Sequence, residues 1–178
     1  MATKTKWIID PSHSEIAFKV KHLMISNVKG VFSQFNGEVL TDDVDFSTAE
    51  INFNLNPATI NTGNSDRDTH LKSPDFFDVE QFDQISFHSQ SMKKVADDVY
   101  LLSGDLQIKG IARSVELKVE FGGLMTDPWG NTKAGFSLSG KINRKDWGLN
   151  WNAALETGGV LVSEEVKIIS EVQLTKAG

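Results

Sequence analysis

The sequence predicts an all-β protein of about eight antiparallel strands, either closed into a barrel or stacked as two sheets. Two observations lead to this fold class. Apolar and polar residues alternate with a period of two through much of the chain, as they do in strands with one buried and one solvated face. Short turn sequences such as Asp42-Asp43, Asp97-Asp98 and Lys109-Gly110 separate the alternating segments. Because parallel sheets are covered on both faces and lack this alternation, we expect antiparallel strands.

The clearest strand covers residues 15–22, where Ile16, Phe18, Val20 and His22 share one face and the residues between them are mostly charged. The predicted strands, in chain order, are 15–22, 35–39, 49–56, 85–88, 100–108, 114–121, 133–142 and 165–174. Closure of these strands into a barrel would remove the exposed sheet edges. We find no linker, low-complexity run or internal repeat, so we expect a single domain over residues 1–178.

Residues 64–78 interrupt the alternation and predict a short helical segment. Asn64 or Ser65 can cap a helix whose first turn carries Asp66 and Asp68, and Ser73-Pro74-Asp75 resembles a second helix start. We expect this segment to cover one end of the strands as a lid. The other irregular stretch, 147–163, predicts a long loop with one helical turn near 152–156.

Composition excludes several classes of protein. The chain has 178 residues, a formal net charge of −6 and no cysteine, so we expect no nucleic-acid partner, and disulfides are absent. No apolar run is long enough to cross a membrane as a helix. The N-terminal residues lack the apolar core and cleavage site of a signal peptide, so we expect a cytoplasmic protein. A removed leader replaced by Met1 would instead indicate the periplasm.

The predicted interior is rich in phenylalanine, which makes up 11 of the 178 residues. An eight-stranded barrel can be filled by its own side chains or can hold one small ligand, and the alternation alone leaves both open. Small residues at inward positions favour a hollow interior; they are Gly37, Ala49, Gly104, Ala134 and Gly140. A hollow lined in this way would be an apolar pocket with few polar anchors.

No pattern in the chain indicates catalysis or a metal site. The four histidines are scattered, and no G-x-S-x-G nucleophile elbow is present. Asp66, Asp68 and His70 cannot converge on one ion, because residues two apart point to different sides of a helix. We expect these carboxylates to cap the helix and to pair with Arg67. His22 is either a hydrogen-bonded core residue or a contact for the polar head of a ligand.

Several motifs in chain order resemble the YceI-like, polyisoprenoid-binding protein family. They are Trp7-x-x-Asp10-Pro11-x-His13-Ser14, Val28-Lys29-Gly30-x-Phe32, Arg67-Asp68-x-His70-Leu71-x-Ser73-x-Asp75-Phe76-Phe77-Asp78, Gly104-x-Leu106-x-Ile108-x-Gly110, Asn143-Arg144-x-Asp146-Trp147-Gly148-Leu149 and Gly159-x-Leu161-Val162-Ser163. The resemblance implies an eight-stranded, lipocalin-like antiparallel barrel with an elongated apolar cavity. It also implies a bound isoprenoid or similar amphiphile, often in a homodimer, and no enzymatic reaction. Many family members are exported, and the absent leader departs from that pattern.

These observations together predict a protein that binds, transports or sequesters a long-chain isoprenoid, quinone-type or fatty lipid, without enzymatic activity, cofactor or metal. The predicted ligand contacts are Phe18, Val20, His22, Phe35, Phe53, Leu55, Phe76, Phe77, Phe87, Leu106, Phe136 and Leu138. We assign Arg67 and Asp68 to holding the lid. Two alternatives stay open: an enzyme that acts on a lipid through His22 or His70, and a filled barrel that works through its surface.

Overall fold

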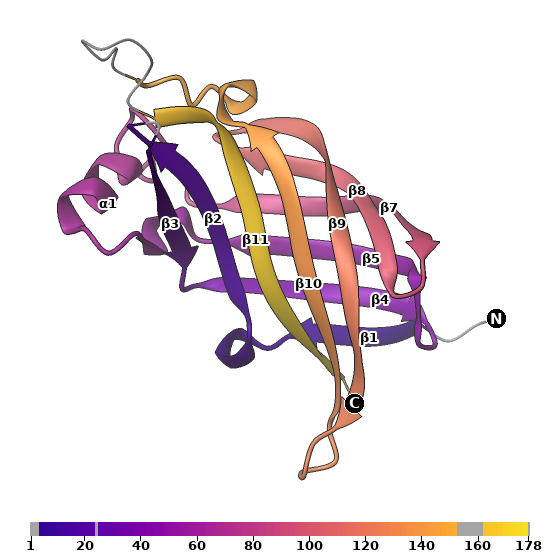
Figure 1. Cartoon of the computed structure of the whole chain (residues 1–178). Helices are drawn as coiled ribbons and strands as arrows, with labels where there is room; N and C mark the ends of the chain where they lie inside the picture. The colour runs from indigo at the N-terminus through magenta and orange to yellow at the C-terminus, as the bar shows by residue number, and fades with distance from the viewer. Residues whose placement is uncertain (1–3, 24, 153–161, 178) are drawn as a thin grey trace.

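The computed structural model describes residues 4–23, 25–152 and 162–177. Strands dominate these residues, and one α-helix, α1 (Ser65–Lys72), packs beside them (Figure 1). Within the described residues no helix is both long and apolar enough to cross a lipid bilayer. Of the helical turn predicted near 152–156, all but Asn152 falls outside the described residues.

Eight strands form a closed antiparallel barrel, which is the architecture that the family resemblance implies and one of the two that the alternation leaves open. The ring consists, in spatial order, of β1 (Lys4–Ile9), β4 (Phe35–Asp42), β5 (Asp45–Leu55), β7 (Ile85–Ala96), β8 (Val99–Ile108), β9 (Ile111–Thr126), β10 (Thr132–Asn143) and β11 (Val162–Lys176). The ring closes where β1 pairs with the end of β11, for example Trp7 with Lys176. All pairs around the ring are antiparallel, and sequence neighbours from β7 to β11 are spatial neighbours.

Three further strands extend the barrel at the α1 end: β2 (Glu15–His22), β3 (Ser26–Phe32) and β6 (Ile60–Asn61). β1 and β2 lie one after the other along β11, because β11 pairs with β1 near Lys176 and with β2 from Glu171 back to Val162. A 3-10 turn at Pro11–His13 separates β1 from β2. Proline cannot donate a ladder hydrogen bond, which suits it to this break. As a result the wall of the barrel continues beyond the ring on one side, next to α1 (Figure 1).

The membership of the ring differs in one place from the predicted set of strands. Residues 15–22 do form a strand, but this strand is β2 and lies in the extension. Its place in the ring is taken by β1, where Trp7 and Ile9 are buried and Ile8 between them is exposed. β1, β3 and β6 are not among the predicted strands. β1 has only three apolar residues in succession and β6 spans only two residues, so neither shows the period-two alternation.

The predicted helix is present, but it is shorter than residues 64–78. Asn64 caps α1 by accepting a hydrogen bond from the backbone N–H of Arg67, 3.0 Å away. The second helix start predicted at Ser73 is wrong: the carbonyl oxygen of Ser73 accepts hydrogen bonds from the N–H groups of both Phe76 and Asp78. Asp78 has a positive φ of 49°, and the N–H groups of Phe77 and Val79 donate to the carbonyls of Leu71 and Lys72, so the chain turns back at the end of α1 instead of continuing as a helix. We call residues 64–78 the lid segment.

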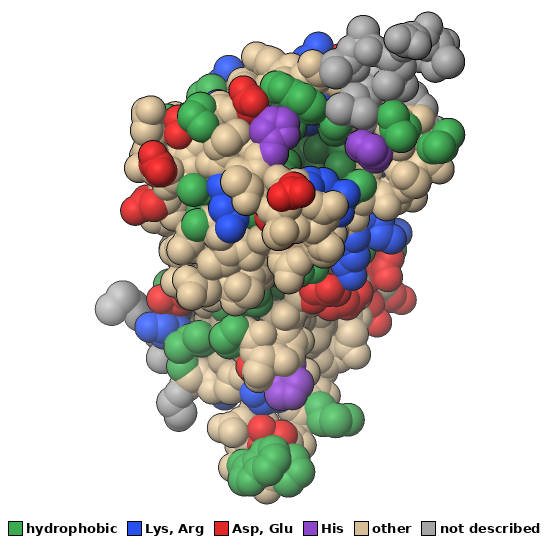
Figure 2. Space-filling view, turned by 90° about the vertical axis from the view of Figure 1, so that its left-hand side faces the viewer, with side chains coloured by type: hydrophobic (Ala, Val, Ile, Leu, Met, Phe, Trp, Pro, Cys, Tyr) green, Lys and Arg blue, Asp and Glu red, His purple; other side chains and the backbone are tan. Residues whose placement is uncertain are grey.

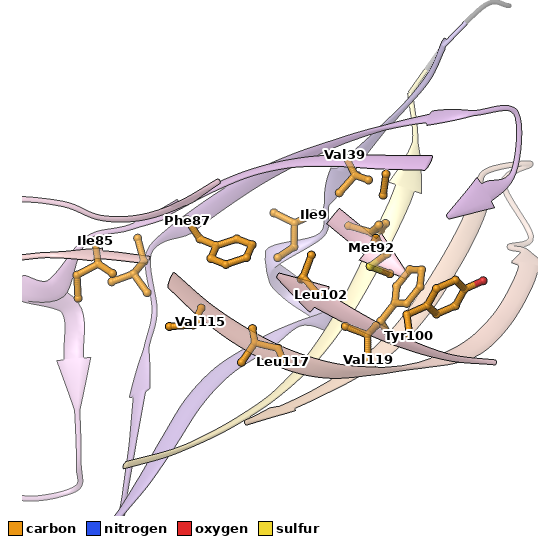
Figure 3. Close-up of a cluster of buried hydrophobic side chains, with 14 of the residues drawn as sticks. Ile9, Val39, Ile85, Phe87, Met92, Tyr100, Leu102, Val115, Leu117 and Val119 are labelled. Carbon is orange, nitrogen blue, oxygen red and sulfur yellow. The ribbon is translucent and has the colours of Figure 1, made fainter. Parts of the chain in front are cut away.

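Aromatic side chains fill the end of the barrel that lies away from α1. The ring of Phe46 lies 5.2 Å from Trp7, 4.8 Å from Phe136 and 5.5 Å from Phe121, measured between ring centroids. Trp7 is fully buried, and its indole N–H donates to Thr41 Oγ1 at 3.0 Å. Further along the barrel, side chains such as Phe87, Leu102 and Leu117 point from different strands into one shared interior (Figure 3). The aromatic cluster therefore forms a floor for that interior.

Candidate functional site

The interior above the aromatic floor is a cavity of about 700 Å³. Pockets that hold small molecules have volumes of about 300–1,000 Å³ and predominantly apolar walls. The walls here are apolar along nearly their whole length, with contributions from β2, the ring strands and the lid segment. Figure 2 shows a hollow lined by hydrophobic side chains, with histidine and basic side chains at its border. The barrel is therefore not filled by its own side chains.

Alternate residues of the strands supply the walls, as the period-two pattern predicts. On β5 the lining residues include Ala49, Ile51, Phe53 and Leu55, while the residues between them face outward. The same alternation appears on the other walls; β9 contributes Val115, Leu117 and Val119, and β11 contributes Val166, Ile168, Ser170, Val172 and Leu174. The side chains of a strand alternate between its two faces. Once one residue of a strand is correctly assigned to the inner face, the other lining residues of that strand follow.

All predicted contact residues except Phe35 line the cavity. They are Phe18, Val20, His22, Phe53, Leu55, Phe76, Phe77, Phe87, Leu106, Phe136 and Leu138. Phe35 begins β4 and packs against Phe53, with 6.2 Å between the ring centroids, but it is not part of the lining. Whether the lining residues touch a ligand stays a prediction.

From the sequence, the inward glycines are expected to leave the interior of the barrel hollow. In the structure, the space beside them is occupied by neighbouring side chains. A Cβ atom at Gly104 would lie 2.5 Å from Cζ of Phe87, and one at Gly37 would lie 3.2 Å from Cδ2 of Phe53. The phenyl rings thus occupy the room that a side chain at these positions would need. This packing keeps the rings against the wall and leaves the centre of the barrel open.

The lid segment is fastened to the barrel through Thr62. Arg67 donates from Nε to Thr62 Oγ1 at 2.8 Å and from Nη2 to the Thr62 carbonyl at 2.7 Å. Asp68 accepts a hydrogen bond from the backbone N–H of Thr62 at 2.9 Å and another from its hydroxyl group. The expected pairing of Arg67 with a carboxylate is wrong for the described residues, because both side chains converge on Thr62 instead. Their assignment to holding the lid agrees with these bonds.

A second arginine, Arg144, lies at the same end of the cavity and is only 4% exposed. It begins the 3-10 turn η3 (Arg144–Trp147) directly after β10. Its guanidinium group donates to four backbone carbonyls, those of Leu149 (2.6 Å), Trp151 (2.8 Å), Ser163 (2.9 Å) and Val162 (3.2 Å). Burial lowers the pKa of Arg144, and the nearby charge of Glu164 opposes that shift.

The histidines near the cavity have different surroundings. His22 lines the cavity, and within the described part of the chain its ring has no hydrogen-bond partner, unlike a buried, paired core histidine. His70 lies 2.9 Å from a carboxylate oxygen of Asp75, and its ring packs edge-on against Trp151 with 4.6 Å between centroids. Both histidines therefore line the cavity, His70 from the lid segment and His22 from β2.

The described residues contain no arrangement typical of a catalytic triad or a metal site. Ser12, His13 and Asp10 lie together, but Ser12 and Asp10 both approach the same ring nitrogen of His13, at 3.2 and 2.9 Å. A triad needs the nucleophile and the carboxylate on opposite ring nitrogens. Across 4–23, 25–152 and 162–177, no group of three His, Cys, Asp or Glu side chains could hold a metal ion.

Sequence reasoning did not assign roles to Arg144, Trp151 or Thr62, which all border the cavity. Arg144 belongs to the motif Asn143-Arg144-x-Asp146-Trp147-Gly148, so the resemblance could have directed attention to it. Trp151 lies in a predicted loop and Thr62 next to a two-residue strand, and neither position has a periodic pattern. Only the folded chain brings them to the cavity.

The fold and the cavity define a class of protein: a closed β-barrel with an apolar interior large enough for a small molecule. A YceI-like domain matches residues 7–174, and the chain belongs to the YceI-like family. A curated relative, a UPF0312 protein of Staphylococcus aureus (strain N315), is 41% identical over 172 residues, which cover 96% of this chain and 98% of the relative.

Solved structures share this architecture. The YCEI protein of Campylobacter jejuni is 29% identical with a TM-score of 0.77, over 89% of this chain and 90% of that one. BcnA of Burkholderia cenocepacia has a TM-score of 0.80 at 20% identity, over 93% and 98% of the two chains. A polyisoprenoid binding domain from Saccharophagus degradans has a TM-score of 0.72 at 13% identity, over 96% and 98%. At these lower identities the likeness shows the fold alone.

Proposed function

We propose that this protein binds a long-chain isoprenoid or a similar amphiphilic lipid, with its hydrocarbon tail inside the barrel, and that it transports or sequesters this lipid without transforming it. The observation that carries the proposal is the apolar cavity of about 700 Å³ between the aromatic floor and the lid segment. Each methylene group removed from water contributes about 0.8 kcal/mol, so a long tail can be held without any charged contact.

The comparisons support this proposal. The fold is shared with a domain described as polyisoprenoid binding, and the cavity found here has the apolar walls that such a ligand requires. A long, flexible hydrocarbon chain fits a deep barrel better than a compact polar substrate would, because almost no polar group reaches the walls below the lid.

The binding experiment uses the purified protein and two readouts. Organic extraction followed by mass spectrometry should recover a long-chain lipid at about one molecule per chain, and a fluorescent fatty or prenyl probe should bind to delipidated protein. Ala49→Phe adds a ring to the cavity wall, whereas Ala112→Phe adds the same ring at an exposed position on β9. We expect the first variant to lose probe binding and the second to keep it. Empty protein that takes up no probe would contradict the proposal.

An enzyme acting on a lipid through His22 or His70 is the second candidate, because both residues lie at the polar end of the cavity. The double substitution His22→Gln and His70→Gln distinguishes the two. A binding protein should keep its affinity for the lipid tail, and neither the unmodified protein nor the double variant should convert the bound lipid. Loss of a measurable lipid conversion in the variant would favour the enzyme.

We further propose that the lid segment controls access of the lipid to the cavity, because α1 and the turn after it form part of the cavity wall. A cytoplasmic location and a homodimer stay predictions. Fractionation of cells and sedimentation of the purified protein would test them.

A further inference from the structure

We propose that the hydrocarbon tail of the lipid also passes through the wall of the barrel, between β9 and β10, from the cavity into a groove on the outer surface. The side chain of Leu117 closes this passage. The inference rests on the proposed function and adds a second route to the one beside the lid segment. It also assigns a ligand to the outer groove, namely the tail of the same long-chain lipid as it enters or leaves.

The first observation is that the ladder between β9 and β10 ends before the two strands do. Both strands lie wholly within the described residues, and their last paired residues toward η3 are Lys118 and Ser139. From there β9 extends back to Ile111 and β10 extends on to Asn143, and no pairing between the two strands is found over these described stretches. Local opening needs less free energy where ladder hydrogen bonds are missing. The wall can therefore separate here more easily than along the paired part of the two strands.

A side chain takes the place of the ladder at this point. The residues that would form the next pair are Leu117 and Gly140, and a Cβ atom at Gly140 would lie 2.5 Å from Cδ2 of Leu117. The leucine side chain thus occupies the space beside the glycine. Leu117 lines the cavity and is 7% exposed. One leucine side chain, and not a row of backbone hydrogen bonds, closes the cavity at this position.

The outer surface is hollowed at the same stretch. A groove of about 450 Å³ is lined by residues of β8, β9, β10 and β11, and Gly140 is one of them. Leu101, Ile168 and Ile169 give the groove apolar surface, which a hydrocarbon tail would cover with a gain in free energy. Ile168 also lines the cavity, so the two spaces meet at this part of the wall. This continuity is what assigns the groove to the tail of the lipid in the cavity.

The ring has a second interruption, which is closed in a different way. β5 pairs with β7 only over Asn52–Leu55, although both strands continue beyond this range. The hydroxyl group of Ser89 accepts a hydrogen bond from the backbone N–H of Ile51 at 2.8 Å, next to the last pair. Phe46, on the unpaired part of β5, is 2% exposed and belongs to the aromatic floor. A hydrogen bond and a buried aromatic cluster replace the ladder there, so we place the passage between β9 and β10.

The exchange kinetics of a fluorescent long-chain fatty acid, measured by stopped flow, test the passage. Leu117→Ala removes the closing side chain and should raise the rate constants of uptake and release at least fivefold, because a lower barrier speeds both directions. Leu102→Ala is the matched control. It removes the same atoms from the cavity lining, but Leu102 on β8 is paired with both neighbouring strands. It should change both rate constants by less than twofold, and equal acceleration in the two variants would overturn the inference.

A surface variant keeps the test decisive if either alanine variant does not fold. Ser139→Trp fills the outer groove without altering the core, because Ser139 is exposed and lines the groove. It should at least halve both rate constants and leave the equilibrium affinity unchanged. Ser114→Trp places the same ring at an exposed position of β9 outside the groove and should change neither quantity. Exchange rates that are the same in Ser139→Trp and Ser114→Trp would overturn the inference.

An equilibrium titration of the unmodified protein separates the inference from the proposed function. If the delipidated protein binds the fatty acid but Leu117→Ala and Ser139→Trp exchange it at the rates of their controls, the inference fails while the proposed function stands. If the delipidated protein binds neither this probe nor a prenyl probe, the proposed function itself fails. The result that we expect is faster exchange in Leu117→Ala and its reversal when Ser139→Trp is added.

Discussion

The ring of Phe18 occupies the space that a side chain at residue 30 would fill. Phe18 on β2 and Gly30 on β3 are direct partners in the antiparallel ladder, and a Cβ atom at Gly30 would collide with Cζ and Cε1 of the ring. Phe53 and Gly37 form a second such pair across β5 and β4. Glycine opposite phenylalanine thus lets a large ring lie against the wall of the cavity instead of across it.

Gly30→Ala should therefore narrow the cavity. The added methyl group displaces the Phe18 ring, and we expect a loss of about 1–3 kcal/mol in the free energy of unfolding together with weaker binding of a long-chain probe. Denaturant unfolding and probe titration measure the two effects. Gly135→Ala is the control, because a Cβ atom there meets no atom within 4 Å. Equal behaviour of the two variants would contradict this packing role.

Arg144→Lys should destabilise the protein even though the charge is kept. A lysine ammonium group cannot reproduce the fork of a guanidinium group that donates to carbonyls on both sides of the segment 152–161. Hydrogen bonds from charged groups contribute about 1.5–3 kcal/mol each, so we expect a loss of about 3 kcal/mol in urea unfolding. Arg113→Lys, at an exposed site, should be close to neutral. A loss below about 1 kcal/mol for Arg144→Lys would show that the four bonds contribute little.

Thr62→Ala should loosen the lid segment. The hydroxyl group of Thr62 accepts from Arg67 and donates to Asp68, so its removal deletes one bond to each of them. We expect faster uptake and faster release of a fluorescent lipid in stopped-flow measurements, with a smaller change in equilibrium affinity. Thr69→Ala removes a hydroxyl group from the exposed side of α1 and should leave both rates unchanged. Unchanged rates in Thr62→Ala would argue against gating by this segment.

Asp10 should make the stability of the barrel depend on pH. Burial pushes the pKa of this carboxyl group upward, but hydrogen bonds from Ser12, His13 and Lys133 together hold it well below its usual range. A carboxylate whose pKa is lowered on folding stabilises the protein fully above its unfolded pKa of about 3.9, and this stabilisation declines as the pH falls below that value. Asp10→Asn should therefore destabilise the protein at pH 7, and its difference from the unmodified protein should shrink below about pH 4.

Chemical denaturation between pH 2.5 and 7 measures this difference. Asp83→Asn, at an exposed position, serves as the control for loss of one negative charge. A constant difference across the whole range would mean that the ionised form of Asp10 contributes nothing to stability. Asp10 follows β1, and its partner Lys133 lies on β10, the strand on the other side of β11. Their hydrogen bond therefore links the two strands that flank β11 where the barrel closes.

The walls of the cavity could be predicted from the sequence because they depend on local alternation alone. Ala49, Ile51, Phe53 and Leu55 line the cavity in the predicted phase, and the strand needs no information from its partners to set that phase. Phe35 shows the limit of this reasoning: it has the right phase but lies at the first residue of β4, outside the lining. The alternation shows which face of a strand a residue occupies. It does not show how far along the strand the cavity extends.

The amino-acid sequence by itself determined the class of fold, the lid segment and the apolar character of the walls, since each follows from interactions between residues a few positions apart. The tertiary structure alone decided that β1 closes the ring, that the aromatic floor leaves about 700 Å³ open, and that Arg144 borders this space with its guanidinium group bound to backbone carbonyls. These features depend on contacts between segments such as β1 and β11, which lie more than 150 residues apart. A local sequence pattern cannot predict contacts between segments so far apart in the chain. The burial of a charged group and the volume of a cavity depend on how all the strands of the barrel pack together.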